Sequence, residues 1–145
     1  GITIDTSTLT LEKSGIISAS TSGKGDAGDI NIEARNITID QSAVDSSTVG
    51  DSARKGGNIN INTSNLTLKN GYISTETTSK GDAGNIQLGI TDNLKLTNST
   101  ISSGASSDST GKAGSINIDP EFYYNSCIVG GCVAGFISEY NVSTL

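Results

Sequence analysis

Few residues in this chain of 145 residues could perform acid–base or metal chemistry. The chain has no His and only two Cys, so the commonest protein ligands of zinc, copper and haem iron are missing, and a hydrolytic Ser–His pair is excluded. A β-helical enzyme that cleaves polysaccharides would need carboxylates, or an Arg or Lys base, gathered on one outer face. Asp5 and Asp40 occupy similar places after strand-like segments, with Glu33 nearby, and this scatter is typical of solvated surface charge. We expect no catalytic residue, no metal site, no cofactor and no enzymatic activity.

The two cysteines, Cys127 and Cys132, are separated by the residues Ile-Val-Gly-Gly. Two hairpin geometries are open. A four-residue loop sets the cysteines directly opposite each other, within bridging range, whereas a two-residue turn at Gly130-Gly131 pairs Val129 with Cys132. In an exported protein we expect the disulfide, and a pair of this spacing without His is not typical of a metal or redox centre.

The overall composition narrows the class of protein further. Lys and Arg number 9 against 15 Asp and Glu, a net charge of −6, which leaves no basic surplus for nucleic acid. No stretch approaches the roughly 18 apolar residues that cross a bilayer, so we expect no membrane span. Ser, Thr, Asn, Gly and Ile are abundant and all rank low on the helix scale, which favours strands.

An internal repeat organises the chain. Each block begins with two aliphatic residues that alternate with polar ones, continues with a second such pair, and then has a single aliphatic residue before a Ser/Thr/Gly-rich loop. The blocks span 1–28, 29–57, 58–84 and 85–114, with a fifth from 115 onward. The first pairs are Ile2/Ile4, Ile30/Ile32, Ile59/Ile61, Ile86/Leu88 and Ile116/Ile118. Alternation with period two indicates strands, about three short ones per block, with one face buried.

A single block is too small to bury its own apolar face, and stacking the blocks solves this because equivalent Ile and Leu residues then lie on one another. The sequence therefore predicts an all-β fold, a right-handed parallel β-helix (β-solenoid) of about five coils with 27–30 residues per coil, over residues 1–122. An antiparallel sandwich is the alternative, but it does not require blocks to repeat at a fixed spacing.

Asn and Gly recur at the corners of the predicted coil. Stacked Asn side chains can form hydrogen-bond ladders, and Asn also tolerates a left-handed backbone. The Gly that ends each GDAG or GKAG segment is expected to adopt that left-handed backbone at the sharpest bend. The ladder candidates are Asn36, Asn65 and Asn93 before the second pair, and Asn70, Asn98 and Asn125 before the third strand.

The segments GKGDAGDINIEARNITID, ARKGGNININTSNLTLKNGYIS and GKAGSINIDPEF resemble the repeats of filamentous-haemagglutinin-like exoproteins, in particular the large cyanobacterial ones exported by two-partner secretion. The shared form is a small-residue turn ending in Gly, an x-I-x-I strand, a polar bend and an L-T-L-like strand. The resemblance covers about residues 1–122. It implies a right-handed parallel β-helix on the outer surface of a bacterium, with adhesive or surface-structural work and no catalytic residues.

Residues 123–145 form a segment of different composition, rich in aromatic residues and holding both cysteines. Its start, Asn125–Ile128, aligns with Asn98–Ile101. One interpretation is a cap over the open end of the solenoid; the other is an assembly segment that stacks on the uncapped first coil of a second molecule and builds a filament. The candidate cap or assembly residues are Ile2, Ile4, Phe122, Tyr123, Tyr124, Phe136 and Tyr140.

Three functions follow from these patterns. The first is a structural β-solenoid module of a secreted or cell-surface adhesin-like protein, acting as a rigid shaft or a surface-interaction scaffold. The alternative is a self-assembling subunit of an extracellular filament, built by head-to-tail stacking. A carbohydrate-active β-helix enzyme is the least supported. The expected partners are the chain itself or cell-surface glycans, bound through the polar Ser/Thr/Asn faces, with no nucleic acid.

Overall fold

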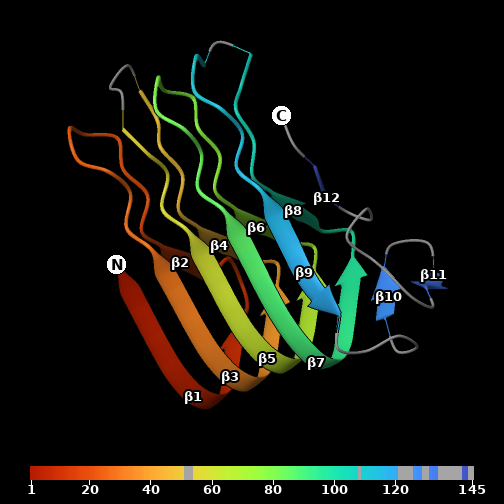
Figure 1. The fold of residues 1–145 in the computed structure, drawn as a ribbon. Helices are drawn as coiled ribbons and strands as arrows, with labels where there is room; N and C mark the ends of the chain where they lie inside the picture. The colour runs from red at the N-terminus through yellow and green to blue at the C-terminus, as the bar shows by residue number, and fades with distance from the viewer. Residues whose placement is uncertain (51–53, 108, 121–125, 129–130, 134–141, 144–145) are drawn as a thin grey trace.

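The computed structural model describes residues 1–50, 54–107, 109–120, 126–128, 131–133 and 142–143. The described chain is all-β and winds into a parallel β-helix in which successive coils lie side by side (Figure 1). The strands are β1 (Ile2–Leu11), β2 (Ile16–Ser18), β3 (Ile30–Asp40), β4 (Ala43–Asp45), β5 (Ile59–Lys69), β6 (Tyr72–Ser74), β7 (Ile86–Thr97), β8 (Thr100–Ser102), β9 (Ile116–Pro120), β10 (Ser126–Ile128), β11 (Gly131–Val133) and β12 (Val142–Ser143).

Each of the first four coils consists of one long strand and one short strand. The long strands β1, β3, β5 and β7 pair in parallel, and the short strands β2, β4, β6 and β8 form a second parallel sheet. Each long strand turns a corner, so that it supplies two sides of the coil (Figure 1). The two first strands expected in each block are thus one bent strand. In β3 the consecutive residues Arg35 and Asn36 both lie outside the core, so the alternation of buried and exposed side chains changes at the corner. The pairing of β3 with β5 continues before and after this corner.

The aliphatic residues stack in register from coil to coil, as the repeat predicts. Ile61 pairs with Ile32 on one side and with Leu88 on the other, and its side chain is fully buried. The short strands do the same, with Val44 paired to Ile73. These ladders form one continuous core, and each buried Ile or Leu contributes roughly 1.5–3 kcal/mol to its stability. The parallel β-helix predicted from the sequence is confirmed.

The number of complete coils is four rather than five. The strand β9 begins a fifth coil by pairing with the first half of β7. The expected continuation of the repeat into Asn125–Ile128 is wrong, because Cys127 of β10 pairs with Lys95 in the second half of β7, and Val142 of β12 takes the place beside Ile101. The fifth block lacks a second aliphatic pair of the L-T-L kind, so the repeat cannot direct this part of the chain.

The antiparallel pair β10–β11 places the backbone of Cys127 opposite that of Cys132, which is the first of the two hairpin geometries considered for these residues. The side chains of both cysteines lie outside the described part of the structure, and the disulfide stays a prediction. The candidate cap residues Phe122, Tyr123, Tyr124, Phe136 and Tyr140, and the ladder candidate Asn125, also lie outside the described residues.

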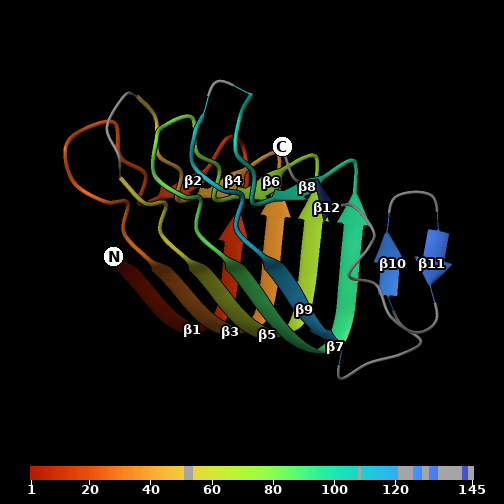
Figure 2. The same ribbon diagram turned by 45° about the horizontal axis from the view of Figure 1, so that its top comes forward.

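Loops that lead from each short strand to the next long strand project together along one side of the coil (Figure 2). Single bridges join neighbouring loops, from Thr21 to Thr48, from Thr48 to Thr77 and from Thr77 to Ala105. The side chains of Thr48 and Thr77 are buried. The interior therefore has an aliphatic part under the strands and a hydroxyl-lined part under the loops.

The glycines that end the blocks do not adopt the expected left-handed backbone. Among the described glycines only Gly50 has a positive φ, whereas the left-handed corner residues include Asn70 and Asn98. Glycine is needed at the block ends because two backbones lie too close together to leave room for a side chain. A Cβ atom on Gly84 would lie 2.0 Å from the carbonyl oxygen of Gly57 in the preceding coil, so the two backbones could not approach each other.

Candidate functional site

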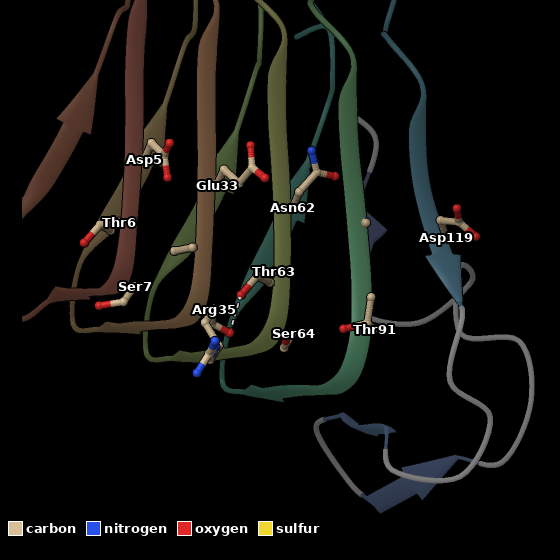
Figure 3. Close-up of a pocket in the computed structure, with 12 residues that line it drawn as sticks. Asp5, Thr6, Ser7, Glu33, Arg35, Asn62, Thr63, Ser64, Thr91 and Asp119 are labelled. Carbon is tan, nitrogen blue, oxygen red and sulfur yellow. Dashed lines mark hydrogen bonds between the residues drawn. The ribbon is translucent and has the colours of Figure 1, made fainter.

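A shallow groove of about 630 Å³ follows the corner of the long strands (Figure 3). Its outer row of residues comes from five successive strands, aligned by the register of the sheet. This row is Asp5, Glu33, Asn62, Gly89 and Asp119. The groove thus collects carboxylates that are far apart in the sequence.

The grouping differs from the one that the sequence suggests. Asp5 pairs directly with Glu33, whereas Asp40 lies at the far end of β3 and pairs with Lys69. The expected equivalence of Asp5 and Asp40 is therefore wrong, because they follow different halves of the long strand. Glu33 and Arg35 point toward different parts of the groove (Figure 3).

The carboxylates of the groove are not gathered into one cluster. Within the described ranges no three Asp, Glu, His or Cys side chains come close enough to hold a metal ion. Asn62 lies over Gly89, where an added Cβ would meet its Oδ1 atom at 2.6 Å, and this contact separates the carboxylates of Glu33 and Asp119 along the row. Asp5 and Glu33 are therefore neighbours in the row, and Asp119 is apart from them.

Asn36, Asn65 and Asn93, for which the sequence predicts a ladder, are joined by hydrogen bonds. Asn65 Nδ2 donates to Asn36 Oδ1 at 2.9 Å, and Asn93 Nδ2 donates to Asn65 Oδ1 at 2.8 Å. Asn70 and Asn98 have φ values of 49° and 46°, and no side-chain hydrogen bond joins them in the described part of the chain. These two residues occupy the left-handed corner after the long strand.

Further side-chain hydrogen bonds between coils flank the first aliphatic residue of β3, β5, β7 and β9. Asn60 Nδ2 donates to Asn31 Oδ1, and Asn117 Nδ2 donates to Gln87 Oε1, both at 2.9 Å. One residue before the strand, Asn58 Oδ1 accepts the backbone N–H of Asn85 at 2.9 Å. These hydrogen bonds were not predicted, although the same polar residue types recur at these positions in most blocks.

Buried hydroxyl groups connect the coils under the loops. Thr77 Oγ1 accepts a hydrogen bond from Thr48 Oγ1 at 2.9 Å and donates to the carbonyl oxygen of Gly81 at 2.9 Å. Thr75 Oγ1 and Ser103 Oγ both donate to the carbonyl oxygen of Gly84, at 2.8 and 2.6 Å. These hydroxyl groups provide hydrogen-bond donors to buried backbone carbonyls. The residue type alone could not distinguish these buried Ser and Thr residues from the solvated ones in the repeat.

The first coil exposes part of the core. Ile2 and Ile4 are only partly buried where they pack against the aliphatic ladders of the next coil. In the described structure β1 stands at one end of the sheet and pairs only with β3. Its outer edge therefore presents unpaired backbone groups beside apolar side chains.

No family model, curated protein or solved structure matches this chain. Among the described residues there is no helix of the length and apolar character that would cross a membrane.

Proposed function

We propose that this chain is a structural β-solenoid module of a secreted or cell-surface adhesin-like protein and acts as a rigid shaft or surface-interaction scaffold. The observation that carries the proposal is the in-register stacking of whole coils, in which the core Ile, Leu and Val residues of both sheets lie on one another from coil to coil. The resemblance of the repeats to filamentous-haemagglutinin-like exoproteins supports the surface location.

Several kinds of bonding oppose bending or shearing of such a stack. Backbone hydrogen bonds of the parallel sheets run along its axis, and the amide ladder of Asn36, Asn65 and Asn93 runs beside them. The hydroxyl network under the loops adds further links between coils, such as that from Thr48 to Thr77. A displacement between two coils would break all of these together, which suits a shaft or a scaffold with fixed faces.

The length of the stack provides a test of this function. Inserting further copies of residues 58–84 after Gly84 repeats an existing junction and adds whole coils. We expect small-angle X-ray scattering to show that the longest dimension grows by about 4.8 Å with each added coil. A variant that becomes compact or disordered instead would contradict the shaft.

An antibody against the chain should label intact cells of the organism that makes it, and labelling only after lysis would contradict the surface location.

End-to-end assembly is the second candidate: in the described residues β1 pairs only with β3, and Ile2 and Ile4 are only partly buried. A parallel strand from another copy could continue the sheet, and such a contact does not close on itself. Light scattering at rising concentration should then show filaments, and Ile4→Lys should abolish them while the outward-facing Thr3→Lys leaves them intact. A wild-type chain that stays monomeric at every concentration would exclude assembly.

A further inference from the structure

The outer face of the short-strand sheet carries an exposed aromatic ring. Tyr72 of β6 is 45% exposed, and the register places it between Ala43 of β4 and Thr100 of β8. Ile16 of β2 continues the same row beyond Ala43 and is 62% exposed. Within the described residues, Tyr72 is an exposed aromatic side chain and Ile16 an exposed aliphatic one. Their row is therefore more apolar than the polar surfaces around it.

Hollows lie on both sides of the Tyr72 ring. One, of about 200 Å³, is bounded by Ile16, Ala43 and Tyr72, with the polar groups of Gln41 and Asn70 at its edge. The other, of about 400 Å³, is lined by Tyr72 together with Asp45, Glu76 and the hydroxyl residues Ser47, Ser74, Thr100 and Ser102. The ring is thus accessible from an apolar side and from a strongly hydrogen-bonding side.

The two carboxylates of the second hollow are held in place by hydroxyl groups. Asp45 accepts hydrogen bonds from the hydroxyls of Ser20 and Ser47, and Glu76 Oε1 accepts one from Ser102 Oγ at 2.6 Å. Among the described residues that line the two hollows there is no Lys or Arg. Fixed acceptors of this kind can bind hydroxyl donors with little loss of side-chain freedom.

These groups define the chemistry of a ligand. An exposed phenol ring packs well against a flat apolar surface, while oriented carboxylates favour ligands that donate several O–H groups. Acidic ligands are disfavoured, because Asp45, Glu76 and the net charge of −6 repel them. An uncharged pyranose ring combines one apolar face with a rim of hydroxyls.

We propose that this surface, the Tyr72 face (Ile16, Ala43, Asp45, Tyr72, Glu76 and Thr100), binds a neutral saccharide. The sugar ring stacks on Tyr72, and its hydroxyls donate to Asp45 and Glu76. The inference rests on the proposed function, since a scaffold holds this face in a fixed shape. Equivalent positions in the neighbouring coils are Ile16, Ala43 and Thr100, so within the described residues this row offers one aromatic platform, and it binds weakly unless many copies act together.

Amide chemical shifts in a nitrogen-labelled chain test this site with defined probes: maltohexaose, cellohexaose, mannohexaose, galactohexaose, an oligogalacturonate of the same length, and trilysine. We expect at least one neutral hexasaccharide to shift the amides of Ala43, Tyr72 and Ser74, and the oligogalacturonate to leave them unchanged. Tyr72→Ala should weaken this binding by about tenfold, whereas Tyr72→Phe, the matched control, keeps the ring and should stay within about threefold.

Three outcomes would overturn the inference: no neutral hexasaccharide shifts these amides, Tyr72→Ala leaves the affinity unchanged, or trilysine binds more tightly than every saccharide. The last would assign the face to a cationic ligand. Thermal unfolding of Tyr72→Ala should match that of the wild type, which shows that the fold is retained. If coil insertion lengthens the stack but no saccharide binds, the scaffold stands and the saccharide site fails; if insertion does not lengthen it, the proposed function fails whatever binds.

Discussion

Single residues decide how closely two coils approach each other. Gly84 is buried, and its carbonyl oxygen accepts hydrogen bonds from both Thr75 and Ser103. An added Cβ would stand 2.0 Å from the carbonyl oxygen of Gly57, which is backbone and cannot rotate away. The absence of a side chain at this position is therefore a condition for stacking.

Gly84→Ala should be destabilising by at least about 1–3 kcal/mol, since the coils must separate locally and the hydroxyl bonds to this carbonyl must lengthen. Denaturant unfolding followed by circular dichroism measures the loss. Gly25→Ala is the matched control, because nothing lies within 4 Å of a Cβ at Gly25, and it should be neutral or slightly stabilising. Equal effects of the two substitutions would contradict the close approach of coils at Gly84.

The amide ladder could be predicted from the sequence, whereas the role of Gly84 could not. A ladder needs only the same residue type at the same place in successive coils, and the repeat displays this directly for Asn36, Asn65 and Asn93. The spacing between two backbones is a property of the folded chain, so the sequence points only to a turn at Gly84. The burial of Thr77 is also a property of the folded chain, so the sequence does not distinguish Thr77 from the many solvated Thr residues.

Alternation of apolar and polar residues identifies strands but not their ends. In β3 the side chains of Ile30 and Ile32 are buried, and Ile37 and Ile39 are buried after the corner. The first two lie at even-numbered positions and the last two at odd-numbered positions, so the alternation must change once between them. In the sequence this change looks like the end of a strand, and in the structure the strand bends and continues.

The strand β5 provides the sharpest test of which side faces inward. Ile61→Asp places a charge between Ile32 and Leu88 with no partner for it, and we expect a loss of more than about 4 kcal/mol, enough to unfold the chain. Thermal unfolding and circular dichroism measure this loss. Asn60→Asp, the neighbouring control, removes one exposed hydrogen bond to Asn31 and should cost only about 1 kcal/mol. Normal melting of Ile61→Asp together with collapse of Asn60→Asp would mean that the inward and outward faces are exchanged.

The number of complete coils in the molecule follows from how far the full repeat extends along the chain. Each of the first four blocks supplies two aliphatic pairs and a single aliphatic residue, and each forms a complete coil. The fifth supplies only Ile116 and Ile118 before the pattern stops. Its first strand, β9, continues the sheet as the repeat predicts, whereas β10 and β12 pair with β7 and β8 without the repeat pattern. The stack is thus a linear array in which each coil contacts mainly its neighbours, and its stability should grow with the number of coils.

Removing one whole coil tests this view of the molecule. Deletion of residues 58–84 joins Gly57 to Asn85 and brings the fourth coil onto the second. Every aliphatic position then meets its equivalent, and Asn93 can donate to Asn36 as it now does to Asn65. We expect a folded β-protein that unfolds cooperatively at a lower temperature than the wild type, as measured by calorimetry and circular dichroism.

Deletion of residues 58–71 is the control: it removes about half a coil, places polar residues on aliphatic ones, and should abolish folding. If both deletions unfolded the chain alike, the coils would not be interchangeable units, and the core would depend on contacts specific to the third coil.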